Sequence, residues 1–440
     1  MPAAVAALAV VAGCATSTAS GGGRPSSPSA QHRPAARAGP ARDGGDAAGG
    51  ANASGVTGSA AQAGSAARQV AGQAAANLAV AARVAAARQA ATARLPQLAS
   101  LPAMSDRQLA GQRIIYSYSG LTPPARLLRR IRNGQAAGVI FFAGNIASRA
   151  QIRQVAVELQ QAALSKRNPV REPLLLITDQ EGGAVRRLPG APFRSEKQIG
   201  ESAQPGAEAT TAGTGAGRNL HGVDMNVNLA PVLDVYRVAG NFIDEFGRSY
   251  SMDPSVVSAL GADFITAQQA EGVAATGKHF PGLGAARRRQ NTDERPVTLN
   301  LSSHTIRTVD EFPYRAAIAA GVKLVMVSWA AYPALGSHRP AGLSSKIVQG
   351  ELRQRLGFTG VTITDALGAG ALRSYGAIPN RSVLAATAGM DLLLCAGQRV
   401  GEGIQGLDAL LGGYRGGTLD KTAFQAAARR VIALRASLAG

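Results

Sequence analysis

This chain of 440 residues has few of the residues on which several common classes of protein depend. Its two cysteines, Cys14 and Cys395, are too few for a disulfide framework. Aromatic residues make up only 4% of the chain, and no nucleic-acid-binding motif is present, so the sequence predicts no nucleic-acid partner. The five histidines lack metal-site spacing and the glycine-rich phrases fit no nucleotide-binding pattern, which predicts no metal and no cofactor.

Acidic residues are also scarce. The chain has 46 Lys and Arg against 27 Asp and Glu, a formal net charge of +19. Residues 1–104 contain eight arginines, Asp43 and Asp46, so this part carries +6 and the remainder +13. Such an excess favours contact with anionic surfaces without identifying one.

The N-terminal apolar run over residues 1–19 is too short to span a bilayer as a helix, and it resembles the apolar region of a secretory signal. Residues 11–14 (VAGC) resemble a lipobox, in which the cysteine is lipidated and becomes the new N-terminus, although no Lys or Arg precedes the run. We therefore predict a lipoprotein-type signal over residues 1–14, lipidation at Cys14, and an extracytoplasmic protein that is anchored by lipid or secreted. The alternative is an alanine-rich disordered start.

Three further segments follow from composition. Residues 15–58 contain almost no large apolar side chain, so they cannot bury enough surface to fold and are predicted to form a disordered tether. Residues 59–103 are rich in alanine with scattered Val and Leu, which favours a helix with a thin apolar face. Residues 104–440 are predicted to form the folded domain.

Short apolar runs alternate with helical stretches through this domain, which predicts βα units and a parallel sheet. Seven or eight units suit a closed α/β barrel of the (β/α)8, or TIM, type. Asp179, Asp234, Lys278 and Asp365 lie at or just after run ends, where barrel enzymes place their chemistry. The runs cover residues 138–142, 174–178, 225–229, 274–278, 324–328, 361–364 and 390–394.

Four motifs resemble, in order, the signatures of glycoside hydrolase family 3. They are residues 176–188 (LITDQEGGAVRRL), 229–235 (LAPVLDV), 278–282 (KHFPG) and 356–365 (LGFTGVTITD). The chain is most similar to the branch with a single barrel, the β-N-acetylhexosaminidases of the NagZ type, because it ends without room for a second α/β domain. The resemblance covers residues 104–438.

The resemblance assigns roles to individual residues. Asp365 matches the catalytic nucleophile of a retaining glycosidase, although an Asp after a strand can also cap the next helix. The other matching residues are expected to bind the sugar through charged hydrogen bonds, while Asp234 either contacts it or orients Arg or Lys neighbours. These sugar-binding candidates are Asp179, Arg187, Arg248, Lys278 and His279.

The sequence departs from the family after Lys278. The hexosaminidase branch continues to an Asp-Ser-His triplet that supplies the acid/base catalyst, whereas residues 283–294 read LGAARRRQNTDE and contain no histidine. Asp293 occupies the triplet by order and is the predicted acid/base. Alternatively, Glu294 donates the proton or the loop catalyses poorly.

Two neighbouring features are left open. Arg287, Arg288 and Arg289 either point inward and lower the pKa of Asp293, or point outward and bind an anionic polymer. Trp329, the single Trp, either stacks on a sugar or packs in the core.

The resemblance thus implies a retaining exo-β-N-acetylhexosaminidase that acts on N-acetylglucosamine-containing cell-wall fragments. One alternative is a β-glycosidase of other sugar specificity, and another is transfer of the sugar to phosphate, which an acid/base carboxylate should disfavour by repelling the anion. The third is a catalytically impaired, sugar-binding lipoprotein.

Overall fold

The structure of the protein is a computed structural model that describes residues 100–438. The predicted signal with Cys14, the tether and residues 59–99 of the alanine-rich segment lie outside the described residues. The first described helix, α2 (Asp106–Gly111), begins after Ser105, whose hydroxyl accepts a hydrogen bond from the backbone N–H of Gln108. Among residues 100–438, no helix is long and apolar enough to cross a membrane.

Eight parallel strands form one sheet in the order β11-β8-β7-β6-β3-β2-β1-β12. A further parallel bridge pairs Ile363 of β11 with Leu392, the residue before β12, and so closes the sheet into a barrel. The predicted α/β barrel is confirmed. The strands are β1 (Ile114–Tyr116), β2 (Gly138–Ile140), β3 (Leu175–Thr178), β6 (Val227–Asn228), β7 (Ala274–Phe280), β8 (Leu324–Val327), β11 (Val361–Thr364) and β12 (Leu393–Leu394).

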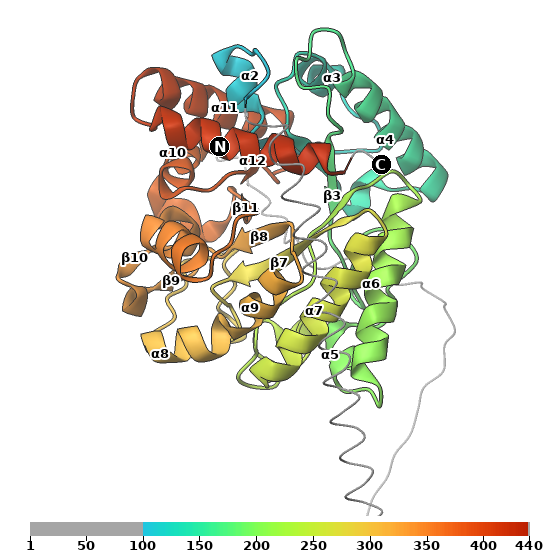
Figure 1. Cartoon of the computed structure of the whole chain (residues 1–440), viewed down its shortest axis with the longest axis vertical. Helices are drawn as coiled ribbons and strands as arrows, with labels where there is room; N and C mark the ends of the chain where they lie inside the picture. Colours follow the sequence, from blue (N-terminus) through green and yellow to red (C-terminus); the bar gives the residue numbers. More distant parts are fainter. Residues whose placement is uncertain (1–99, 439–440) are drawn as a thin grey trace, which may run out of the picture. The chain divides into compact units, whose positions relative to one another are not determined.

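A helix or helical segment follows each strand and covers the outside of the barrel (Figure 1). In chain order these are α3 (Ala125–Arg132), α4 (Arg149–Ala163), α6 (Pro205–His221), α7 (Pro254–Ala270), α9 (Phe312–Ala319), the π-helical segment η7 (Lys346–Arg355), α10 (Ile378–Ala388) and α11 (Val400–Arg415). Shorter or additional elements are α5 (Glu196–Gly200), α8 (Ser303–Thr305), α12 (Lys421–Ala436), β4 (Gln180–Gly182), β5 (Val185–Arg186), β9 (Ala331–Tyr332) and β10 (Ser337–Pro340).

Buried side chains lie on both faces of the strands, as expected for a parallel sheet covered by helices. In β3, Leu175 and Ile177 belong to a cluster to which all eight barrel strands contribute, which fills the barrel interior. Leu176 points the opposite way and joins the layer between strands and helices. This alternation explains why the strands read as continuous apolar runs.

Helix α12 closes the N-terminal end of the barrel. Its Val431 and Leu434 join the interior cluster. The fully buried guanidinium of Arg435 donates from Nε to the carbonyl of Pro173 (2.8 Å) and from Nη2 to that of Glu172 (2.6 Å), just before β3 begins. Helix α12 does not cover the opposite end, where the strands terminate, and the predicted site residues lie at that end.

Candidate active site

The predicted site residues converge at the C-terminal ends of three strands. Asp179 directly follows β3 and Asp365 directly follows β11. Lys278 and His279 lie inside β7, which continues to Phe280, two residues beyond the predicted run. Arg187 follows the β4–β5 hairpin, and its backbone N–H donates to the carbonyl of Asp179 (3.1 Å).

A compensated cluster of buried charges forms the floor of the site. The Lys278 ammonium lies 2.9 Å from Asp179 Oδ1 and 2.6 Å from Glu181 Oε1. Arg248 binds the same Glu181 carboxylate with two hydrogen bonds, from Nε to Oε2 (2.9 Å) and from Nη2 to Oε1 (2.8 Å). Burying an ammonium group is costly unless it is paired, and here two carboxylates meet it.

The charges of this cluster shift one another's pKa values so that each group keeps its charge. Burial acts to raise the pKa of Asp179, but Lys278 and Arg187 outweigh it and hold that pKa below its usual value. Burial likewise opposes ionisation of Glu181, yet Arg248 and Lys278 lower its pKa to about 2. Conversely, burial tends to lower the pKa of Lys278, and Asp179 and Glu181 raise it above its ordinary value. All four groups are therefore charged at neutral pH, with Asp179 presenting acceptor oxygens and Arg248 donors.

Glu181 was not among the predicted site residues, although it joins Arg248 to Lys278. A signal for it was present in the sequence. Residues 179 and 181 are two apart in an extended segment, so their side chains share one face. A second acidic residue on the face of Asp179 indicates a partner for nearby cations.

Arg248 reaches the cluster from the loop after β6. Gly247, with φ of +63°, ends the short turn η3 (Asp244–Phe246) in the left-handed region that favours glycine, and its amide donates to the Asp244 carbonyl (2.8 Å). The Lys197 ammonium anchors the same turn, 2.7 Å from Asp244 Oδ1. The turn thus aims the next residue, Arg248, at Glu181.

Asp234 orients its neighbours. The fully buried carboxylate accepts hydrogen bonds from His279 Nδ1 (2.7 Å), the His279 amide (3.2 Å) and the Leu283 amide (2.6 Å). Because a carboxylate only accepts, Nδ1 donates and Nε2 is the remaining ring nitrogen for substrate. Asp234 therefore has an orienting role, but the groups that it orients are His279 and the Leu283 amide and not the Arg or Lys neighbours that were predicted.

Asp365 does not cap a helix. Its Oδ1 accepts from the amide of the next residue, Ala366 (2.7 Å). The following helical segments, η8 (Gly370–Tyr375) and α10, begin after Ala369 and Ala377 instead. The carboxyl is half-buried at the end of β11, and the alternative capping role is ruled out.

The loop that carries Asp293 lies against the segment after Asp365. The carbonyl of Thr292 accepts from the Ala371 amide (3.0 Å), and that of Asp293 accepts from the Gly370 amide (2.6 Å). A Cβ atom at Gly370 would overlap the backbone of Glu294, so this approach requires glycine. Burial and then the Asp365 carboxylate raise the pKa of Asp293 to about 6, while Arg248 and His279 oppose the rise.

The neighbouring charged residues differ from Asp293. Glu294 is exposed, and its carboxylate accepts from Asn291 Nδ2 (3.3 Å) and lies 3.6 Å from the Arg295 guanidinium. Arg287, Arg288 and Arg289 are exposed, so the inward orientation that would lower the pKa of Asp293 is not adopted.

The indole of Trp329 is fully buried and its Nε1 donates to the carbonyl of Ala366 (2.9 Å). Of the two predicted environments, Trp329 therefore occupies the core. Within residues 100–438, no group of three His, Cys, Asp or Glu side chains is placed to hold a metal ion.

Known proteins are similar to this chain in sequence and in fold. A family model described as "Glycosyl hydrolase family 3 N terminal domain" matches residues 107–434. An uncharacterized secreted glycosyl hydrolase of Arthroderma benhamiae is 46% identical over 331 residues, covering 75% of this chain and 93% of its own. A β-hexosaminidase of Xylella fastidiosa strain M23 is 30% identical over 342 residues, covering 71% and 98% respectively.

Solved structures agree with the fold. A glycoside hydrolase family 3 β-N-acetylglucosaminidase from Paenibacillus sp. superposes with a TM-score of 0.71 at 32% identity, covering 77% of this chain but only 64% of its own. The β-N-acetylhexosaminidase of Beutenbergia cavernae gives a TM-score of 0.67 at 28% identity, covering 76% of this chain and 99% of its own.

Proposed function

This chain belongs to glycosyl hydrolase family 3, and from that premise we propose that it is a retaining exo-β-N-acetylhexosaminidase acting on N-acetylglucosamine-containing cell-wall fragments. The observation that carries the proposal is the pair of carboxyl groups at the barrel mouth. Asp293 has a pKa raised to about 6 by burial and by Asp365, so it retains a proton closer to neutral pH than an ordinary Asp. The β-hexosaminidase and β-N-acetylglucosaminidase relatives support the sugar.

The proposed reaction has two steps. Asp365 attacks the anomeric carbon and forms a glycosyl ester, while the bond from that carbon to the leaving oxygen breaks and Asp293 protonates this oxygen. Asp293, now a carboxylate, removes a proton from water. The water oxygen then bonds to the anomeric carbon as the ester bond breaks, releasing the sugar and restoring Asp365.

The remaining site residues hold the sugar in this proposal. Asp179 accepts hydrogen bonds from hydroxyls, while Lys278, Arg248 and Arg187 donate. His279 donates or accepts through Nε2, with its orientation held by Asp234. Glu181 positions Lys278 and Arg248 without contacting the sugar.

A panel of aryl β-glycosides tests the activity. Wild type should release the phenol from the N-acetylglucosaminide faster than from the glucoside, and Asp365→Asn should be slower by roughly 10³-fold or more. After a slow fluorinated donor, mass spectrometry should find the sugar on the peptide that contains Asp365. A label on another carboxylate would overturn the nucleophile.

The panel also separates the alternatives. A preference for another aryl β-glycoside would indicate a β-glycosidase of different specificity. Binding of N-acetylglucosamine without turnover or trapped ester would indicate a catalytically impaired sugar-binding protein, the candidate favoured by the missing loop histidine.

We propose that the barrel (residues 104–440) acts outside the cytoplasm, joined by the helical segment (59–103) and the tether (15–58) to a lipid on Cys14, which follows a signal over residues 1–14. The secreted relative supports an extracytoplasmic location. In cells, Cys14→Ser should move the protein from the detergent phase to the aqueous phase. Equal partitioning of both forms would contradict the lipid anchor.

A further inference from the structure

An open cleft of about 390 Å³ adjoins the proposed site. Its lining comes from the two loops that carry Arg248 and Asp293. Phe242, Glu245 and Phe246 belong to the loop after β6, and the other lining residues to the loop after β7. Those residues are Arg288, Arg289, Asn291 and Glu294.

The cleft lies on the leaving-group side of the proposed chemistry. Asn291 and Glu294 flank Asp293, the group that would protonate the leaving oxygen. The sugar-binding charges, Asp179 and Lys278, are absent from its lining. A substrate whose sugar ring occupies those charges and whose leaving oxygen meets Asp293 would extend its leaving group towards this cleft.

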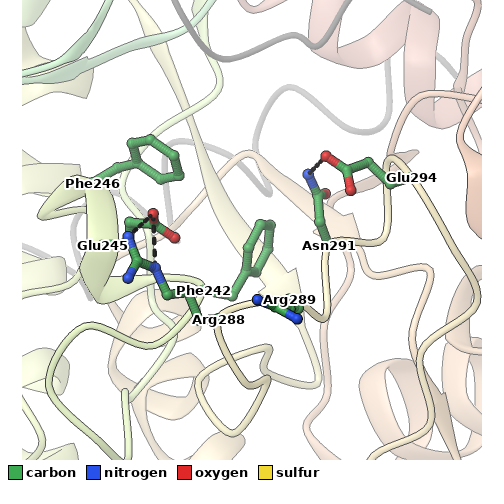
Figure 2. A pocket seen from close by; sticks show the side chains of 7 residues that line it. All are labelled: Phe242, Glu245, Phe246, Arg288, Arg289, Asn291 and Glu294. Atoms are coloured by element: carbon green, nitrogen blue, oxygen red, sulfur yellow. Dashed lines mark hydrogen bonds and ion pairs between the residues drawn. The ribbon is translucent and has the colours of Figure 1, made fainter.

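Among the residues that the structure describes, Arg289 is the cation of the cleft that has no acidic partner. Arg288 is engaged by Glu245, with hydrogen bonds of 3.0 Å from Nε and 2.8 Å from Nη2 to one carboxylate oxygen. Glu294 has Asn291 and Arg295 as neighbours. Within residues 100–438, the Arg289 side chain makes no ion pair. Figure 2 shows Arg289 and Phe242 between the Arg288–Glu245 pair and the Asn291–Glu294 pair.

The lining combines this charge with apolar surface. Phe242 is 9% exposed and Phe246 is half-buried, so both rings are held in place by packing. An aromatic ring beside a free guanidinium suits a ligand with an apolar face and an anionic substituent. Arg also binds planar carboxylates and phosphates with two parallel hydrogen bonds.

We propose that this cleft binds the leaving group of the substrate and that Arg289 recognises an anionic substituent on it, a carboxylate or a phosphate. The inference rests on the proposed function, because it assumes that a sugar is cleaved beside Asp293. It adds the class of glycoside that is preferred, namely one with an acidic leaving group.

Three aryl N-acetyl-β-glucosaminides test this inference with the full chain. Their rings are identical except for a carboxylate, a phosphonate or a neutral carboxamide. For Arg289→Ala, the ratio of kcat/KM between each acidic glycoside and the carboxamide should fall about tenfold below the wild-type ratio. Comparing ratios between enzymes cancels the intrinsic difference in leaving-group ability, and the larger loss identifies carboxylate or phosphate as the preferred group.

Arg287→Ala is the matched control, since Arg287 is exposed in the same loop but does not line the cleft. Its ratios should equal those of wild type. Equal ratios in wild type and Arg289→Ala, or an equal fall in Arg287→Ala, would overturn the assignment of Arg289.

The proposed function fails separately, if even the carboxamide glycoside is not cleaved. In that case calorimetric titration with the intact glycosides tests whether the cleft binds their acidic substituent through Arg289. Wild type should bind the acidic glycosides about tenfold more tightly than Arg289→Ala does, and equal affinities would overturn the inference.

Discussion

At the scale of single residues, the site is defined by charges that compensate one another. Lys278 and Arg248 both form ion pairs with the Glu181 carboxylate. These pairs allow two buried cations to remain protonated. Within residues 100–438, Asp293 has no such cation in direct contact, and its pKa rises where those of Asp179 and Glu181 fall. The environment thus separates carboxyl groups that bind or orient from the one that can carry a proton.

The pKa of Asp293 predicts a pH profile. The acid form exists below about pH 6, so kcat/KM for glycosides with poor leaving groups should fall as the pH rises through that value. Asp293→Asn should remove this limb and slow such substrates by roughly 10²- to 10⁴-fold, with smaller losses on activated aryl glycosides. Stopped assays across pH 4 to about 9 measure both effects.

Azide and a neighbouring variant are the controls for Asp293. Azide should partly restore turnover of an activated aryl glycoside by Asp293→Asn, because this anion attacks the glycosyl ester without a general base. Glu294→Gln, a substitution of the exposed neighbour, should keep the wild-type profile. A lost limb in Glu294→Gln alone would transfer the role to Glu294.

Glu181→Gln should destabilise the fold and weaken sugar binding. Among the described residues, removing this carboxylate leaves Arg248 with no charged partner in direct contact and Lys278 with Asp179 alone. We expect a cost of about 3–5 kcal/mol in the free energy of unfolding. Urea denaturation measures the loss, and KM should rise. Glu208→Gln, which breaks a surface pair with Arg194, should cost less than about 1 kcal/mol.

The low pKa of Glu181 fixes the direction of the pH dependence. Its folded-state pKa of about 2 lies below the ordinary 4.5, so its contribution is present above pH 4.5 and declines as the pH falls towards 2. A difference between wild type and Glu181→Gln that does not shrink over this interval would contradict the assignment.

At the scale of elements, the position of Asp293 depends on contact between two loops. The loop after β7 lies on the segment after β11, with Gly370 at the contact. The separation of Asp293 from Asp365 is not fixed by either loop alone. It also depends on the barrel, because β7 and β11, the strands that precede the two loops, are both neighbours of β8 in the sheet.

Gly370→Ala should displace the Asp293 loop and lower kcat/KM about 10²-fold for substrates that need an acid. The pKa seen in the pH profile should also fall towards that of an ordinary Asp, as the carboxyl moves away from Asp365 and becomes exposed. Gly368→Ala is the control, since a Cβ there meets its nearest atom at 3.9 Å. Unchanged kinetics in Gly370→Ala would refute this role for the contact.

At the scale of the whole molecule, the barrel is stabilised at the end opposite the site. Arg435 joins α12 to the segment before β3, and its buried guanidinium donates hydrogen bonds to the carbonyls of two half-buried residues. These contacts link residues about 260 positions apart in the sequence.

Arg435→Ala should lower the free energy of unfolding by roughly 2–4 kcal/mol, because it removes a fully buried side chain and the charged donor to the half-buried carbonyls of Glu172 and Pro173. KM should change little, since the site is at the other end. Arg415→Ala, which removes an exposed pair with Asp106, should cost less than about 1 kcal/mol. A Tm for Arg435→Ala equal to that of Arg415→Ala would contradict the closing role of α12.

Pattern alone predicted most of the fold. Seven apolar runs identified seven of the eight barrel strands, because strands buried on both faces are apolar throughout. The missing strand, β1, has three residues and follows Gln112 and Arg113, polar residues whose burial depends on partners elsewhere in the chain.

The sequence by itself determined the barrel, the family and which residues lie at its strand ends, because these depend on local order and on the direction of parallel strands. Only the tertiary structure decided how those residues act on one another. Glu181 joins Arg248 to Lys278, and Asp234 orients His279. The Asp365 carboxylate raises the pKa of Asp293. Each of these effects depends on distances across the barrel. Electrostatic coupling and burial are set by separation in space, and that separation exists only once the eight strands have closed.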